Sequence, residues 1–159
     1  MAENQTNNQS DAEPFLLFEL AGTTYAVRSQ SAQHVELVEV ITPVPNAPPA
    51  VEGVIFSRGQ VIPAVNLRVR FGLEKKAHDL RTRLIVVNAR GRVIGLIVDS
   101  AREFISIPSS VIQPPNEAIS GLKGKYLEAI ATMGDRIILI LNLDEVIDLA
   151  ETLVAASEG

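Results

Sequence analysis

Arg58 and Gly59 form the tip of a predicted hairpin, where a guanidinium could recognise a carboxylate. The segment GVIFSRGQVIPAVNLR, residues 53–68, has β-type apolar runs on both sides of this pair, which is typical of two antiparallel strands. Gly59 can adopt the positive φ that a tight turn requires. Arg58 could then make paired hydrogen bonds to a partner while the strands hold its position. Turn tips are often polar without any function, so these residues alone leave both interpretations open.

His34 and Glu36 lie at the start of the apolar segment VELV, residues 35–38. Histidine can act as a general base near neutral pH. Its apolar neighbours instead favour a partly exposed His34 in a helix-like or strand-entry segment, without a catalytic role. Glu36 is a lone carboxylate in an apolar stretch, and either a binding role or an ordinary position would fit it.

The remaining polar motifs do not form a catalytic pattern. Asp99 and Ser100 follow the run VIGLIV, but no histidine lies nearby in the sequence to activate the serine. We expect them to cap a following short helix. Asp144 and Glu145 open a predicted terminal helix, where acidic groups offset the helix dipole. The segment SGLKGKY, residues 120–126, lacks the spacing and the ending of a phosphate-binding loop. We therefore expect no enzyme activity.

The composition excludes several other classes of site. The chain has 159 residues, a net charge of −5 and 4% aromatic residues, which disfavours a nucleic-acid surface because such surfaces need clustered cations and stacking platforms. It has no cysteine and two histidines, so thiolate chemistry and an ordinary zinc site are not expected. We predict no metal, no cofactor and a reducing compartment.

The two ends and the apolar segments predict a protein that is not inserted in a membrane. Residues 1–13 are polar and lack a basic region followed by an apolar one, so we expect a disordered tail and no secretory signal. The apolar run IILILNL, residues 137–143, is much shorter than the roughly 20 residues of a membrane helix. With 47% hydrophobic residues the chain can still form a substantial core.

The strands of the Arg58 hairpin are predicted to be committed to the core. The apolar side chains expected there are Val54, Ile55, Phe56, Val61, Ile62, Ala64 and Val65. Pro63 has no N–H, so we expect it at an edge, at a bulge or where that group would face away from the ladder.

The chain contains a duplication that supplies two sets of strands. Residues 15–35 match residues 84–104 without a gap, placing Gly22 on Gly91. Residues 58–67 match residues 133–143 once one residue is inserted in the second copy, and this places Asn66-Leu67 on Asn142-Leu143. Two hairpins matching in the same order favour duplication over coincidence. Closing each set of strands into a small barrel would bury its edges.

The connections complete a mainly β architecture. Residues 38–53 contain four prolines and are expected to be extended, residues 106–126 take the same place in the second copy, and residues 74–79 read as a solvated linker. After Asp144 the apolar side chains Val146, Leu149, Ala150 and Leu153 have helical spacing. We expect this helix to pack on a barrel, with its end and a tail at residues 148–159.

Three blocks of the sequence resemble the CheW family of chemotaxis coupling proteins. They are GVIFSRGQVIPAVNLRVRFGL at 53–73, RVIGLIVDSAREFISIPSSVIQPP at 92–115, and YLEAIATMGDRIILILNLDEVI at 126–147. The resemblance implies a CheW-like domain at residues 14–147, made of two SH3-like, five-stranded β-barrel subdomains packed side by side with strands partly exchanged. It also implies a non-catalytic adaptor in the cytoplasm, recruited to membrane-associated receptor arrays.

The partners implied by the resemblance are proteins. Such adaptors bind the cytoplasmic tip of methyl-accepting chemoreceptors and the regulatory domain of a CheA-type histidine kinase, and they bind no nucleic acid. The positions that match the family's partner-binding residues are Glu36, Gly53, Arg58, Gly59 and Phe104.

The sequence departs from the family pattern beside these positions. Phe56-Ser57 stands where the family has Asn-Leu, residues 66–68 read Asn-Leu-Arg in place of Asp-Leu-Arg, and the segment from Glu36 to Asn46 is shorter than is typical. An adaptor of a related pathway, controlling surface motility or another output and binding only one of the two usual partners, is therefore the alternative. A small-molecule-binding barrel would need a polar cavity, which these apolar strands do not predict.

Overall fold

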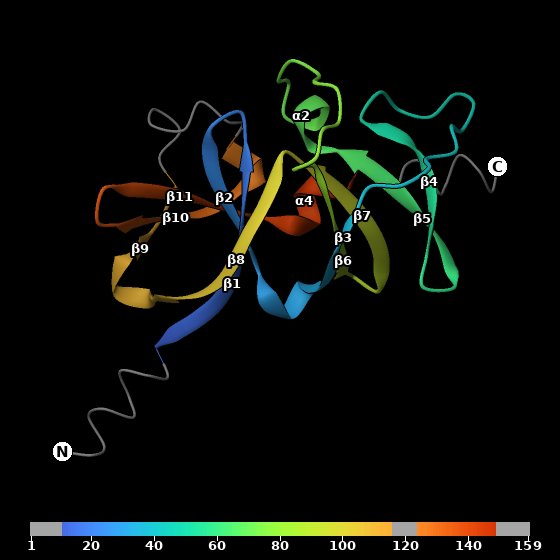
Figure 1. Cartoon of the computed structure of the whole chain (residues 1–159). Coiled ribbons are helices and arrows are strands. Elements are labelled where there is room, and N and C mark those ends of the chain that lie inside the picture. The colour runs from blue at the N-terminus through green and yellow to red at the C-terminus, as the bar shows by residue number, and fades with distance from the viewer. Residues whose placement is uncertain (1–10, 116–123, 149–159) are drawn as a thin grey trace.

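Two curled antiparallel sheets lie side by side in the computed structural model, which describes residues 11–115 and 124–148 (Figure 1). The first sheet has the strand order β8-β1-β2-β11-β10-β9, and the second has the order β3-β6-β7-β5-β4. We call them the first and the second barrel. The predicted mainly β class with two small barrels is confirmed, although the two-residue strand β9 makes the first sheet six-stranded.

The strands and helices follow one another with short connections. The strands are β1 (Ala12–Leu20), β2 (Thr23–Arg28), β3 (Ala32–Leu37), β4 (Val51–Ser57), β5 (Gln60–Asn66), β6 (Arg83–Ala89), β7 (Arg92–Val98), β8 (Ser100–Pro108), β9 (Ile112–Gln113), β10 (Leu127–Met133) and β11 (Arg136–Leu141). The helices are α2 (Leu67–Arg70) and α4 (Leu143–Val146), with 3-10 turns η1 (Ser29–Ser31), η2 (Ser109–Val111) and η3 (Gly124–Tyr126). None of the helices in the described residues is long and apolar enough to cross a bilayer.

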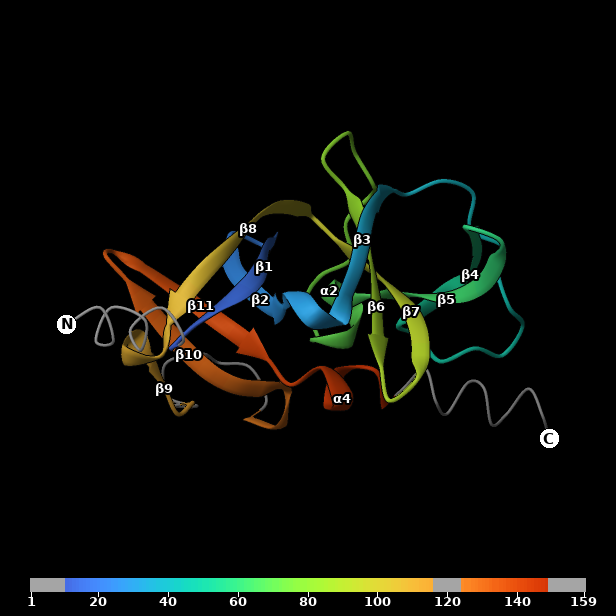
Figure 2. The same ribbon diagram turned by 90° about the horizontal axis from the view of Figure 1, so that it is seen from below.

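The two copies of the duplication exchange strands. The hairpin β1-β2 of the first copy pairs with β8 and, through a parallel contact, with β11 of the second copy. The hairpin β6-β7 of the second copy pairs in the same way with β3 and β5 of the first. Each barrel is therefore built from both copies, and neither copy closes a barrel by itself, as Figure 2 lets the reader follow from a second side.

The duplicated hairpins also have equivalent turns and caps. The pair Ser57 and Gln60 closes the β4-β5 turn, and the pair Met133 and Arg136 closes the β10-β11 turn. From these pairs to the following asparagines the two copies align without a gap, so the inserted residue that we predicted is wrong. The side chains of Asn66 and Asn142 cap α2 and α4 by accepting from the backbone N–H three residues later.

Burial on both faces explains the continuous apolar runs. In β1, Phe15 and Leu17 point into the first barrel, whereas Leu16 and Phe18 point into a cluster shared with the second barrel. Successive side chains of a strand alternate between faces, so a strand that is buried on both faces has no polar position in its centre. The shared cluster makes the two barrels one folding unit.

The two ends of the chain partly follow the predictions. Strand β1 begins at Ala12, which pairs with Pro108, so the predicted tail at 1–13 is too long at its end. Residues 1–10 lie outside the described part. The terminal helix begins as expected, with Val146 buried, but Leu149, Ala150 and Leu153 lie outside the described residues.

An ion pair between Arg68 and Asp99 joins the barrels. Arg68 donates to both carboxylate oxygens of Asp99, from Nε at 2.8 Å and from a terminal nitrogen at 2.6 Å, and the backbone N–H of Ala21 in the first barrel donates to Asp99 Oδ2 at 2.8 Å. The prediction that Asp99 and Ser100 cap a helix is wrong, because Ser100 begins strand β8. The carboxylate is instead used by the two donors that converge on it.

Replacing Asp99 with asparagine is expected to remove a pH-dependent part of the stability. Hydrogen bonds from Arg68 are the main cause that lowers the pKa of Asp99; partial burial opposes them, and the Ala21 N–H lowers the pKa further. A lowered pKa adds stability above the ordinary value of about 4, and this is lost as the pH falls through the folded-state pKa. Asp99→Asn should therefore lower the free energy of unfolding by about 1–3 kcal/mol at pH 7 and by less at pH 3, measured by urea denaturation.

Asp144→Asn is the control for this experiment. Asp144 pairs with Arg90 on the surface, where about half of each side chain is exposed, and such pairs contribute little. An unchanged gap between Asp99→Asn and the wild type from pH 7 to pH 3 would contradict the account of Asp99.

Candidate functional site

The tip of the β4-β5 hairpin is a two-residue turn with the geometry that the sequence predicts. Arg58 and Gly59 have φ values of 46° and 86°, and Ser57 pairs with Gln60 across them. Positive φ at both central residues is the type I′ arrangement that matches strand twist. Arg58 adopts it without being a glycine, which costs on the order of 1 kcal/mol.

Two large apolar side chains of this hairpin are exposed and not in the core. Phe56 and Val61 face each other across the strands and are 65% and 67% exposed, whereas Ser57 is only 5% exposed. The prediction that Phe56 and Val61 are committed to the core is therefore wrong. The turn sets the register, and alternation along the strand then turns Ser57 inward and Phe56 outward.

Pro63 lies where its missing N–H costs nothing. It is opposite Val54, whose own backbone N–H and carbonyl bond to Thr42 and not to β5, at 2.8 and 2.9 Å. The parallel ladder with β7 begins one residue later, at Ala64. The expectation that this group would face away from the ladder is confirmed.

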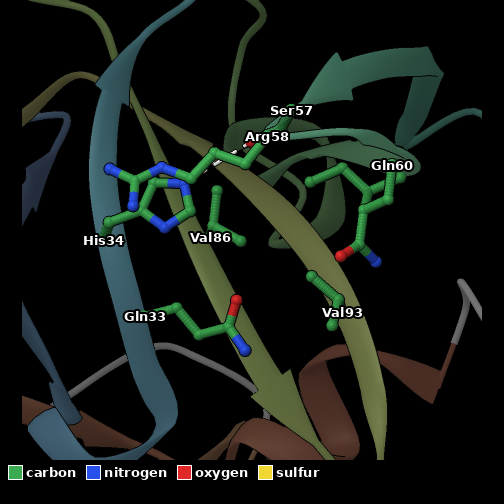
Figure 3. A pocket seen from close by; sticks show the side chains of 8 residues that line it. Gln33, His34, Ser57, Arg58, Gln60, Val86 and Val93 are labelled. Atoms are coloured by element: carbon green, nitrogen blue, oxygen red, sulfur yellow. Dashed lines mark hydrogen bonds between the residues drawn. The ribbon is translucent and has the colours of Figure 1, made fainter.

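Arg58 is exposed beside a hollow at the open end of the second barrel. The hollow has a volume of about 210 Å³. Figure 3 shows the Arg58 side chain extending from the hairpin toward β3. No ion pair or hydrogen bond of its guanidinium is found with any residue in 11–115 or 124–148. The residues lining the hollow are Gln33, His34, Ser57, Arg58, Gln60, Ile62, Val86 and Val93.

Glu36, His34 and Ser57 form a polar cluster behind this tip. His34 and Glu36 lie two residues apart on β3, so their side chains share a face. His34 Nε2 contacts Glu36 Oε2, and the Ser57 hydroxyl donates to the same oxygen at 2.8 Å. His34 Nε2 and Ser57 Oγ are 3.5 Å apart. We call these three residues the Glu36 cluster.

The Glu36 cluster does not have the arrangement of a catalytic triad. In a triad, one histidine nitrogen faces the serine and the other faces the carboxylate. Here one nitrogen, Nε2, lies near both groups, and the Ser57 proton is directed at Glu36. Within the described residues there is also no group of three His, Asp or Glu side chains placed to hold a metal ion.

Gly53 has a packing role that explains its residue type. It is buried at a β-bulge, has a φ of 152°, and a Cβ atom there would lie 2.1 Å from the carbonyl oxygen of Thr42. It cannot offer a side chain to a partner, so a contribution of Gly53 to binding stays a prediction that would act through the backbone.

Phe104 lies apart from the hairpin tip. It is on β8 in the first barrel, opposite Leu16, and is 54% exposed. The structure thus brings together Glu36, Arg58 and Gly59 and does not place Phe104 with them. Sequence reasoning missed Ser57 and His34 as partners of Glu36, and the buried position of Ser57 could have been read from its place next to a two-residue turn.

A model of the CheW-like domain matches residues 14–151 of the chain. The chain belongs to the CheW-like domain family. The match includes all five predicted partner-binding residues, and it covers both barrels and the exchanged strands.

Relatives from distant bacteria and a solved structure agree with this assignment. The chain is 27% identical over 139 residues to the chemotaxis protein CheW of Klebsiella aerogenes, covering 87% of this chain and 84% of that protein. It is 29% identical over 136 residues to CheW of Bacillus subtilis, covering 86% and 87%. The crystal structure of the scaffolding protein TtCheW from Thermoanaerobacter tengcongensis matches with a TM-score of 0.81 and 31% identity, covering 86% of this chain and 93% of that one.

Proposed function

We propose that this chain is a non-catalytic adaptor that couples methyl-accepting chemoreceptors to a CheA-type histidine kinase in chemotaxis. The role of a chemotaxis adaptor follows from the family to which the chain belongs. The two partners, the cytoplasmic tip of the receptors and the regulatory domain of the kinase, are the finer part of the proposal. Such an adaptor works in the cytoplasm at membrane-associated receptor arrays.

The observation that carries the proposed binding surface is the hairpin tip. Arg58 is exposed beside Phe56 and Val61, and the rigid turn limits the freedom that its backbone would lose on binding. Aromatic and arginine side chains are enriched among the residues that contribute most to protein interfaces. An exposed aromatic residue beside an arginine without an ion-pair partner in the described chain therefore supports a protein partner.

Reconstitution with purified components tests the proposal. A receptor cytoplasmic fragment, a kinase regulatory domain and this chain are expected to co-elute as a ternary complex in size-exclusion chromatography. Omitting this chain should leave the receptor fragment and the kinase domain in separate peaks. Failure of the chain to bind either component, with a CheW protein of known activity binding both, would refute the proposal.

An adaptor of a related chemosensory pathway, binding one of the two partners, is the second candidate. The changes at Phe56 and Ser57 favour it, because they place an aromatic side chain and a buried hydroxyl next to Arg58. Measuring the affinity for the receptor fragment and for the kinase domain separately distinguishes the candidates. Binding to one partner alone would support the second candidate.

A further inference from the structure

Ser57 and Glu36 connect two strands that are not neighbours in the sheet. Strands β3 and β4 are the outermost strands of the second barrel, and in the described residues each pairs through its backbone with a different strand, β6 and β5. The bond from the Ser57 hydroxyl to Glu36 spans the opening between them. The barrel is thus closed at this end by side chains.

The bond is placed where it controls the hairpin tip. Ser57 directly precedes Arg58, and the turn has only two residues, so a fixed Ser57 leaves the Arg58 backbone few alternatives. Arg58 itself makes no ion pair in the described part of the chain. Its direction therefore depends on the backbone and on the residues that hold the turn.

Burial separates positioning from contact. Ser57 is 5% exposed, so a docked protein could hardly touch it. The Glu36 side chain is 27% exposed, and its Oε2 atom is already occupied by His34 and Ser57. A buried hydroxyl and a carboxylate that satisfy each other hold a geometry more than they offer a binding group.

We infer that Ser57, Glu36 and His34 are positioning residues for Arg58, and that Ser57 affects partner binding through the orientation of the tip. This inference rests on the proposed function, because it concerns the surface that Arg58 forms. The departure of Ser57 from the family pattern is thereby explained: the hydroxyl provides a polar anchor to β3, to which the Glu36 carboxylate is the acceptor.

A double-mutant cycle tests the inference with the kinase regulatory domain and the receptor fragment as probes. Ser57→Ala is expected to weaken binding of the partner that contacts Arg58 by about three- to tenfold, which corresponds to the loss of one hydrogen bond. Ser57→Thr keeps the hydroxyl and should restore most of the affinity. In an Arg58→Ala background, Ser57→Ala should have little further effect, because the group that it positions is gone.

Two outcomes of the cycle overturn the inference. One is an affinity of Ser57→Ala equal to that of the wild type where Arg58→Ala binds weakly. The other is a loss from Ser57→Ala that adds in full to the loss from Arg58→Ala, which would make the two residues independent.

Amide hydrogen exchange provides a second measurement that needs no partner. Ser57→Ala should speed exchange at the amide of Gln60 by about three- to tenfold, while the amide of Thr23, at the equivalent place in the β1-β2 turn, should not change. If the wild type binds no partner, or if Arg58→Ala has no effect, the proposed surface is wrong. Exchange then decides the inference alone, and an unchanged Gln60 rate overturns it.

Discussion

Arg58→Glu is expected to weaken binding to the kinase domain, the receptor fragment or both by on the order of a few kcal/mol, which corresponds to a loss of a hundredfold or more. The guanidinium lies exposed at a two-residue turn and has no ion-pair partner in the described residues. Reversing its charge should therefore repel the group that it recognises without breaking an internal contact. Isothermal titration calorimetry with each purified partner measures this effect.

Stability should be nearly unaffected by the same substitution. Glutamate at position 58 keeps a non-glycine residue at the φ of 46°, so the strain of the turn does not change. Arg81→Glu is the matched control, since Arg81 is exposed in the connection before β6, outside the hairpin. Equal affinity of Arg58→Glu and the wild type for both partners would exclude the proposed surface, whereas a large fall in melting temperature would show that Arg58 supports the fold.

Gly53→Ala is expected to have the largest effect on stability. The added Cβ would lie 2.1 Å from the Thr42 carbonyl oxygen and 2.7 Å from its carbonyl carbon, and both are backbone atoms that can move only with the chain. The substitution would also place a side chain at a φ of 152°. We expect a loss of about 3 kcal/mol or more in the free energy of unfolding, measured by denaturant unfolding monitored by circular dichroism.

Gly134→Ala separates the clash from the backbone conformation. Gly134 has a φ of 61° in the β10-β11 turn, but a Cβ there would meet nothing within 4 Å. Its replacement should cost only about 1 kcal/mol, the strain of a side chain at positive φ. Similar losses for the two variants would contradict the explanation of Gly53 by its contact with Thr42.

The predicted Gly53 binding role illustrates how a sequence match can conceal a structural cause. Gly53 matches a family position, which by itself predicted a place in the partner surface. The contact with Thr42 is a sufficient reason for glycine there. A binding defect in a Gly53 variant would therefore need a stability measurement beside it before it could be assigned to the surface.

Local physics made much of the fold predictable from the sequence. A two-residue turn needs positive φ, and the pair Arg58-Gly59 between apolar runs therefore predicted the hairpin correctly. The asparagines at 66 and 142 marked equivalent helix starts for the same reason, since capping acts within three residues. The duplication followed from the repetition of these local signals.

The candidate site was only partly predictable, because its contacts are distant in sequence. Glu36 and Arg58 were predicted as separate residues, whereas Ser57, 21 residues from Glu36, joins them to one cluster. The exposure of Phe56 was missed because hydrophobicity alone predicts burial. The register of the turn overrides that preference and turns the smaller, polar neighbour inward.

The sequence by itself determined the strands, the tight turns, the helix caps and the duplication, because each depends on interactions between residues a few positions apart. Only the tertiary structure decided which strands share a barrel and which side chains meet. Strand β5 lies beside β7, from the other copy, and Asp99 receives a donor from each barrel. Such choices depend on the packing of the whole core, where the two copies bury both faces of their strands only by exchanging them.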